Sequence, residues 1–155
     1  MTAKPVDNYI NYRAISVIFS TLFDIDDLET VPYNQFVLYG NNNLKKPKII
    51  EGNAKLIRLT PKIYLEDFDE QKLKDYFYFV TQTFMKRKQW IIPFLENWFP
   101  NCGPDLIRKG IPVFKYLGDL MPEEVLELFL YFYNRSDYQN SIYKTMIINY
   151  TEDIM

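Results

Sequence analysis

The sequence predicts a mainly α-helical, bundle-like single domain over residues 1–155, with a small β-hairpin near residues 48–65. Three observations support this class. A chain of 155 residues has the usual size of one domain. Hydrophobic residues make up 48% of it, which is enough apolar surface for a folded core. Several stretches repeat their apolar residues at the helical period, and no long linker or internal repeat separates them. An α+β arrangement is the alternative.

The first predicted helix runs from Asn8 to Phe23, because apolar residues recur there along one helical face. The acids that follow it and Pro32 interrupt the pattern, and the acidic stretch over residues 24–29 is expected to form a solvated turn. Two runs rich in β-branched residues then flank Glu51-Gly52-Asn53, and they predict a hairpin between Lys48 and Leu65.

A long central helix is predicted to start near Asp67. Asp67 and Glu70 have the spacing of a capping box. Apolar residues recur at positions 73, 77, 80 and 84, and the aromatic residues beside them widen the stripe to most of the circumference. We therefore expect this helix to pack on more than one side.

Pro93 is predicted to end or kink that helix, because proline cannot donate a backbone hydrogen bond and clashes with the preceding turn. Lys86, Arg87 and Lys88 would then lie in the last turns, where cations complement the helix dipole. Proline also suits the first turn of a helix, so a short second helix is expected over FLENWF, with Leu95 and Trp98 on one face.

Three weaker elements complete the chain. Residues 106–117 are a helical candidate that Gly110 and Pro112 interrupt. Pro122, followed by two glutamates, predicts the start of an almost wholly apolar helix. A last helix or strand is expected over residues 141–150.

The composition excludes many kinds of active site. The chain has one cysteine, Cys102, and no histidine, so histidine-based triads and the usual zinc sites are absent. No GxGxxG, GxxxxGK[ST] or GxSxG pattern occurs. A calcium loop starting at Asp24 fails, since Glu29 stands where glycine is required. We therefore predict no catalytic residue, cofactor or metal, and we interpret Cys102 as structural.

The location is predicted from the absence of long apolar runs. No stretch approaches the roughly 20 apolar residues needed to cross a bilayer, and the N-terminal residues lack the apolar region of a signal peptide. We expect a cytoplasmic protein that is neither secreted nor bound to a membrane; if it is viral, it would lie in the host cytoplasm or the virion.

Charge is unevenly distributed along the chain. Residues 41–62 are basic and residues 119–155 are acidic. The basic segment could contact nucleic acid, although the net charge of −2 weakens non-specific attraction. It could also pair with the acidic segment of a neighbouring copy.

The leading functional prediction is a non-enzymatic protein that contacts other protein chains, as a homo-oligomer or in a larger assembly. Aromatic residues make up 17% of the chain, more than a core of this size readily hides, and protein interfaces are rich in aromatic residues. Abundant residues with A/T-rich codons suggest a virus or phage, hence a structural or accessory component. The candidate interaction residues are Trp90, Trp98, Lys86, Arg87, Lys88, Lys45, Lys46, Lys48 and Arg58.

Two alternatives remain open. The first is a nucleic-acid-binding regulatory protein that uses residues 45–62 and the cluster Lys86 to Lys88, because cations beside aromatic rings can hold a nucleic-acid strand. The second is a metal-dependent enzyme that uses the acids near Asp67, where Glu66, Asp69 and Glu70 lie close in sequence.

Overall fold

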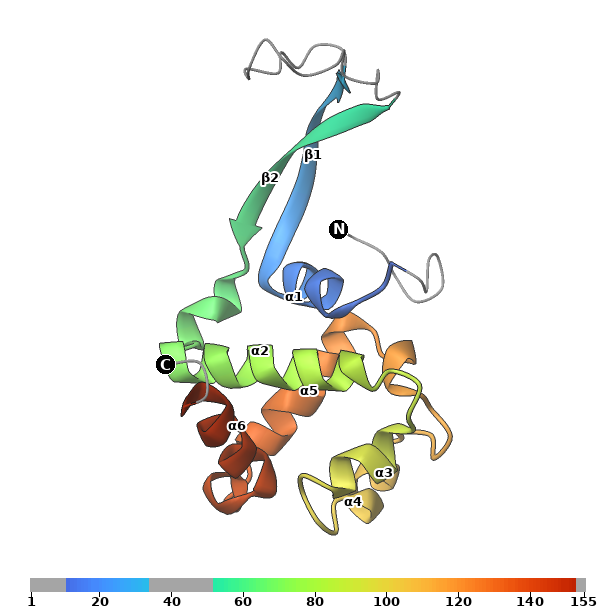
Figure 1. Cartoon of the computed structure of the whole chain (residues 1–155), viewed down its shortest axis with the longest axis vertical. Helices are drawn as coiled ribbons and strands as arrows, with labels where there is room; N and C mark the ends of the chain where they lie inside the picture. Colours follow the sequence, from blue (N-terminus) through green and yellow to red (C-terminus); the bar gives the residue numbers. More distant parts are fainter. Residues whose placement is uncertain (1–10, 34–51, 153–155) are drawn as a thin grey trace, which may run out of the picture. The chain divides into compact units, whose positions relative to one another are not determined.

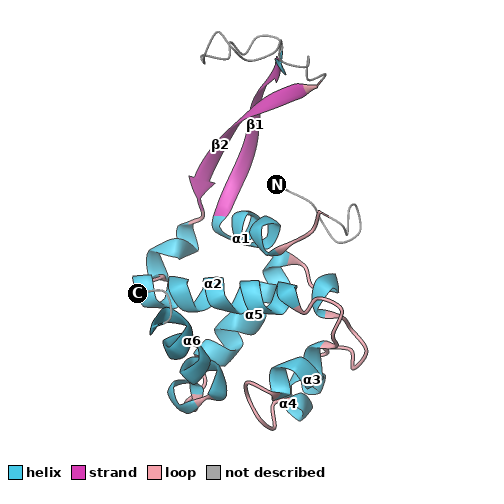
Figure 2. Cartoon of the chain, viewed as in Figure 1, coloured by secondary structure: helices cyan, strands magenta, loops and turns pink. Residues whose placement is uncertain are grey.

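The chain forms two compact units in a computed structural model that describes residues 11–33 and 52–152. The hairpin unit is Phe23–Lys62, and the helical unit comprises Met1–Leu22 with Ile63–Met155. Helices and a two-stranded antiparallel sheet make up the regular structure (Figures 1 and 2). The predicted helical fold with a small hairpin is confirmed at this level. One domain over residues 1–155 stays a prediction.

The hairpin pairs different segments from those predicted. Strand β1, Phe23–Pro32, runs antiparallel to strand β2, Asn53–Pro61, with a bulge between Asp27 and Glu29. The predicted acidic turn is therefore wrong, since these acids lie on a strand. Apolar residues alternate with the acids here, and Ile25 lies opposite Leu59. The first strand predicted, from Lys48, lies outside the described residues.

Gly52 closes the described end of the hairpin. Its φ of 145° belongs to a region that other residues rarely adopt. Its carbonyl accepts a hydrogen bond from the Tyr33 amide at 3.1 Å, and a Cβ at this position would lie 2.9 Å from the Tyr33 ring. Gly52 therefore lies just before β2, whose first residue is Asn53, while Glu51 of the predicted turn lies outside the described residues.

Helix α1, Ala14–Leu22, is shorter than the predicted helix over residues 8–23. Tyr12 lies before it, buried, and donates a hydrogen bond from its hydroxyl to the Leu120 carbonyl at 2.6 Å. At the other end, Phe23 pairs with Pro61 in the sheet. Tertiary contacts at both ends thus set the bounds of the helix, and periodicity alone could not reveal them. Residues 8–10 lie outside the described residues.

Helix α2, Glu70–Met85, is the predicted central helix, but its cap is Asp69. The Asp69 side chain accepts a hydrogen bond from the Lys72 amide at 2.6 Å. Asp67 lies instead in a short 3₁₀ helix, Ile63–Asp67, so the predicted capping box was placed two positions early. Buried residues occur around much of α2, which agrees with packing on several sides.

The remaining helices pack with α2 in the helical unit. They are α3, Ile91–Glu96; α4, Gly103–Arg108; α5, Pro122–Tyr133; and α6, Ile142–Glu152. Short 3₁₀ turns occur at Leu117–Asp119 and Tyr138–Asn140. The start of α5 at Pro122 is confirmed, and the last element is a helix. The candidate helix over residues 106–117 is wrong, because the chain leaves α4 at Gly110, where φ is 86°.

Aromatic rings form the centre of the helical unit. Phe79 of α2 lies within 6 Å of the rings of Trp98, Phe129 and Tyr143, measured between centroids. Phe99 stacks on Phe132 at 4.2 Å. Much of the aromatic content that suggested an interaction surface is therefore buried, where each ring contributes a large apolar area.

Candidate nucleic-acid interface

Lys86, Arg87 and Lys88 lie in a turn that follows α2, rather than inside the helix. Helix α2 ends at Met85, well before Pro93, and the Gln89 amide closes the turn onto the Lys86 carbonyl at 2.8 Å. The prediction that Pro93 ends this helix is therefore wrong. As predicted, Pro93 lies in the first turn of a second helix. That helix, α3, covers Ile91–Glu96 instead of the predicted residues 94–99.

Backbone hydrogen bonds to residues 115–118, which we call the partner segment, hold this turn in place. The Gly118 amide donates to the Arg87 carbonyl at 2.9 Å, and the Leu117 amide donates to the Gln89 carbonyl at 3.0 Å. The Ile91 amide donates in return to the Lys115 carbonyl at 3.0 Å. In a longer α2, the Arg87 and Gln89 carbonyls would accept from amides of the same helix. Their bonds to the partner segment therefore explain why α2 ends before its predicted limit. We call residues 86–90 the basic turn.

Exposed aromatic rings lie beside the basic turn. Trp90 pairs with Tyr116 in an isolated antiparallel bridge, and the two side chains are 43% and 44% exposed. Phe114, which is 72% exposed, meets Trp90 edge to face at 5.3 Å. Trp98 differs: it is only 4% exposed and packs in the core, so it cannot serve as a contact residue on this surface.

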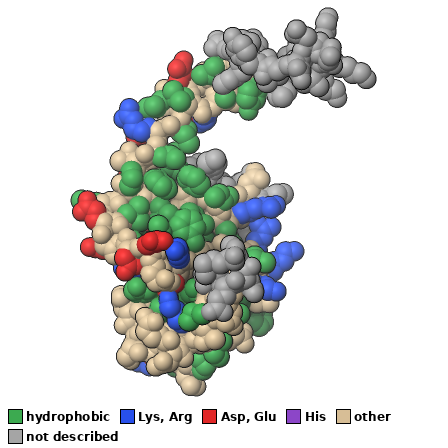
Figure 3. Space-filling view, turned by 60° about the vertical axis from the view of Figure 1, so that its left-hand side comes forward, with side chains coloured by type: hydrophobic (Ala, Val, Ile, Leu, Met, Phe, Trp, Pro, Cys, Tyr) green, Lys and Arg blue, Asp and Glu red, His purple; other side chains and the backbone are tan. Residues whose placement is uncertain are grey.

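The charge around the basic turn is positive. Within the described part of the chain, neither Lys86 nor Lys88 has a carboxylate within ion-pair distance. Arg87 donates to the Tyr12 carbonyl at 3.3 Å and, with Arg13, lines a groove of about 350 Å³. Figure 3 shows Lys and Arg side chains gathered along one edge of the helical unit. A surface of this kind attracts polyanions.

The cations of the hairpin have acidic neighbours. Lys55 forms an ion pair with Asp27, and Arg58 lies opposite Asp26 in the strand register. The β1 acids therefore offset much of the positive charge that the linear sequence assigned to residues 41–62. Lys45, Lys46 and Lys48 lie outside the described residues.

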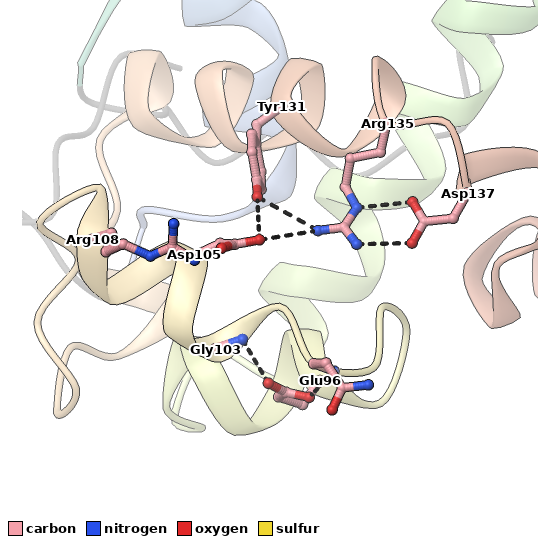
Figure 4. Close-up of polar contacts among 8 residues, drawn as sticks. Glu96, Gly103, Asp105, Arg108, Tyr131, Arg135 and Asp137 are labelled. Atoms are coloured by element: carbon pink, nitrogen blue, oxygen red, sulfur yellow. Dashed lines mark hydrogen bonds and ion pairs between the residues drawn. The ribbon is translucent and has the colours of Figure 1, made fainter.

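A second polar cluster joins α4 to α5 and stabilises the fold locally. Arg135 binds Asp137 through two hydrogen bonds of 2.8 Å, and its guanidinium also lies 3.7 Å from Asp105 (Figure 4). The hydrogen bond from Arg135 lowers the pKa of Asp137. Glu96 accepts from the Gly103 amide at 2.5 Å, which directs its carboxylate toward the start of α4. These acids are therefore occupied by protein partners.

The acids near Asp67 do not form a metal site. Asp69 caps α2, and Glu70 forms an ion pair with Lys74 at 2.7 Å. Over residues 11–33 and 52–152, no group of three or more potential metal ligands occurs. The same residues contain no helix that is long and apolar enough to cross a membrane.

Cys102 should resist alkylation until the protein unfolds. Its side chain is fully buried, and burial raises the pKa of the thiol to about 12, so little reactive thiolate exists near neutral pH. We expect iodoacetamide at pH 8 to modify the folded protein on the order of a thousandfold more slowly than the protein in 6 M guanidinium, where a free thiol has a pKa of about 8.5. Mass spectrometry of timed samples measures both rates, and equal rates would contradict the buried position.

The geometry therefore defines a helical protein with a rigid cationic and aromatic surface. Sequence reasoning identified the basic turn and Trp90, but it missed Arg13, Phe114 and Tyr116. No local signal marks these residues, because they reach the surface through contacts between segments far apart in sequence.

Comparison with known proteins finds a similarity to an enzyme. No known protein-family profile matches the chain. The chain is 26% identical, over an alignment of 194 positions with gaps, to dimethyladenosine transferase 2, mitochondrial, of Drosophila melanogaster. The alignment covers 96% of this chain and 43% of that protein, so the chain spans less than half the length of this relative.

This similarity corrects the leading functional prediction. By its name the relative is a transferase, so it contradicts both the expected non-enzymatic assembly protein and the viral or phage structural component. The prediction of a non-enzymatic protein relied on the absence of catalytic motifs from this chain. The alignment covers under half of the relative, and the catalytic motifs of an enzyme can lie in the other part. Contact with other protein chains stays a prediction.

Proposed function

We propose that this chain is the RNA-binding part of an enzyme that methylates adenosine. The similarity to a dimethyladenosine transferase supports the class of reaction and, because adenosine is a ribonucleoside, RNA as the substrate. The observation that carries RNA binding is the basic turn, where Lys86 and Lys88 are exposed close to the exposed Trp90 ring and, in the described chain, have no carboxylate within ion-pair distance.

Phosphate contacts explain how this surface would bind. Each lysine or arginine that neutralises a phosphate releases a counterion, which favours binding and makes it dependent on salt. Arg87 and Arg13, which line a common groove, extend the positive surface toward α1. Backbone hydrogen bonds fix the turn, so little conformational entropy is lost when RNA binds.

The described residues, 11–33 and 52–152, do not fit the methyl donor that such a reaction requires. The sequence has no GxGxxG turn. Three grooves of about 300, 350 and 480 Å³ in the helical unit have no carboxylate in their lining to bind ribose hydroxyls. A cavity that does include Glu124 and Glu127 has only about 140 Å³, below the size typical of ligand sites. No transfer step is therefore assigned to these residues.

Charge reversal in the basic turn tests RNA binding. We expect Lys86→Glu with Lys88→Glu to weaken binding of a short RNA at least tenfold at 100 mM salt, and to reduce the slope of log affinity against log salt by roughly two. Fluorescence anisotropy with a labelled RNA measures both quantities. Arg87 is left unchanged because it also bonds to the Tyr12 carbonyl.

A matched control distinguishes the loss of this site from the effect of a changed net charge. Arg108→Glu with Lys109→Glu changes the net charge equally, on exposed residues at the end of α4. We expect that variant to retain most of the affinity. Equal losses in both variants, or no binding of the parent chain at low salt, would contradict the proposal.

We also propose a cellular compartment for this chain from the name of the relative. Its name includes the word mitochondrial, which supports a mitochondrial location for this chain. The cytoplasmic location expected from the sequence stays a prediction.

A further inference from the structure

A groove lies directly beside the basic turn. It has a volume of about 480 Å³, and we call it the stacking groove. Its lining comes from the end of the basic turn, from α3 with the residue after it, and from one tyrosine of the partner segment: Lys88, Gln89, Trp90, Pro93, Phe94, Asn97 and Tyr116. A volume of this size accommodates a group as large as a nucleobase with its sugar.

The main chain that carries the two exposed rings of the stacking groove is fixed by backbone hydrogen bonds. Trp90 and Tyr116 face each other in the antiparallel bridge, and hydrogen bonds at Gln89 and Ile91 fix both neighbours of Trp90. Phe114 supports Trp90 edge to face, with an interplanar angle of 74°. Rings positioned in this way lose little freedom when a flat ligand stacks on them, and every nucleobase offers a flat face.

The charges at the stacking groove suit a nucleotide better than an apolar peptide. Lys88 lines the groove, and the described lining contains no acid. Glu96 of α3 accepts hydrogen bonds from the Asn101 and Gly103 amides, so its carboxylate is directed toward the start of α4. The amide side chains of Gln89 and Asn97 line the same groove. An aromatic wall with one cation beside it therefore matches a base and its phosphate.

We propose that the stacking groove binds one unpaired RNA base against Trp90 and Tyr116, with the adjacent phosphate at Lys88. This inference rests on the proposed function and specifies its substrate: RNA with an unpaired nucleotide at the contact, rather than a continuous duplex. In a duplex the base faces are covered by their neighbours, so the rings of the groove have nothing to stack on.

Tryptophan fluorescence of the unmodified chain provides the first test. Trp90 is exposed and Trp98 is buried, so stacking should quench only the Trp90 emission. We expect quenching on titration with a single-stranded RNA, no quenching with a duplex of equal phosphate number, and loss of the effect in Trp90→Phe. This measurement on the parent chain does not depend on any variant folding.

Affinity provides the second test. Base stacking predicts that Tyr116→Ala weakens binding of single-stranded RNA roughly fivefold to a hundredfold, while duplex binding changes little. Tyr150→Ala is the matched control, since Tyr150 is similarly exposed on α6 but lies outside the groove. Thermal melting followed by circular dichroism verifies that both variants fold.

The outcomes distinguish the two proposals. Equal binding of single-stranded and duplex RNA without quenching would overturn the stacking groove and leave RNA binding by the basic turn intact. No binding of either RNA would overturn the proposed function and, with it, the stacking groove. Quenching by an unrelated protein or peptide but not by RNA would also overturn it, by identifying a protein docking site.

Discussion

Replacing Asp75 by alanine is expected to lower the free energy of unfolding by roughly 3–5 kcal/mol. Asp75 is fully buried on α2, and its carboxylate accepts hydrogen bonds from the Tyr138 hydroxyl at 2.6 Å and from Gln71 at 2.7 Å. Lys144 of α6 forms an ion pair with it at 2.7 Å and is only 12% exposed. Removal of the carboxylate would leave a largely buried ammonium without its partner.

Urea denaturation followed by circular dichroism measures this loss. Asp75→Asn is the conservative variant; it keeps one acceptor oxygen and the shape of the side chain but loses the charge and the second acceptor, so we expect a smaller loss than for alanine. Asp137→Ala removes half of a more exposed ion pair with Arg135, and a change of at most about 1 kcal/mol is expected there. An Asp75→Ala variant as stable as Asp137→Ala would show that the buried network contributes little.

The protein should also lose stability steeply above pH 10. Four tyrosines are buried in the helical unit, and burial raises the pKa of each hydroxyl: Tyr12, Tyr76, Tyr138 and Tyr143. In the unfolded chain they ionise near the ordinary value of about 10. Above that pH the unfolded state binds fewer protons than the folded state, so the free energy of unfolding falls as the pH rises.

The expected slope is large because several groups contribute. Each buried tyrosine lowers the free energy of unfolding by about 1.4 kcal/mol per pH unit, hence roughly 5 kcal/mol per unit for four. Below about pH 10 both states keep these protons and the contribution to stability is constant. Denaturation curves at intervals between pH 9 and 12 measure the slope. Tyr12→Phe should reduce this slope by the share of one tyrosine, about 1.4 kcal/mol per pH unit. A free energy of unfolding that stays constant up to pH 12 would contradict the burial of these hydroxyls.

Local signals predicted the helices well and the hairpin only in part. Proline and two glutamates at the start of α5 specify a helix start by themselves, and the structure begins that helix at Pro122. The acids of β1 misled the prediction, because Asp and Glu are common in turns. Their strand forms through pairing with β2, whose residues are some 30 positions later in the sequence. Propensity does not contain that information.

The sequence revealed only part of the candidate interface, because the rest depends on pairing between segments that are distant in sequence. Lys86, Lys88 and Trp90 are neighbours in the chain, so a motif search finds them. Tyr116 reaches Trp90 only through backbone pairing. Trp98 was selected by residue type, yet its position one turn after Leu95 places it in the core among Phe79, Phe94 and Tyr143. Exposure decides whether an aromatic residue binds a partner, and a single sequence does not reveal it.

The pairing between the basic turn and residues 115–118 has a consequence for how this surface can evolve. Main-chain amides and carbonyls make its hydrogen bonds, and every residue except proline has both groups. Substitution of a lysine or a ring can therefore change what the surface binds without changing where its side chains stand. Insertion or deletion of one residue between 86 and 91 would instead shift the register and separate the cations from the rings. In related chains, we expect the spacing of these two segments to be kept more strictly than the identity of their side chains.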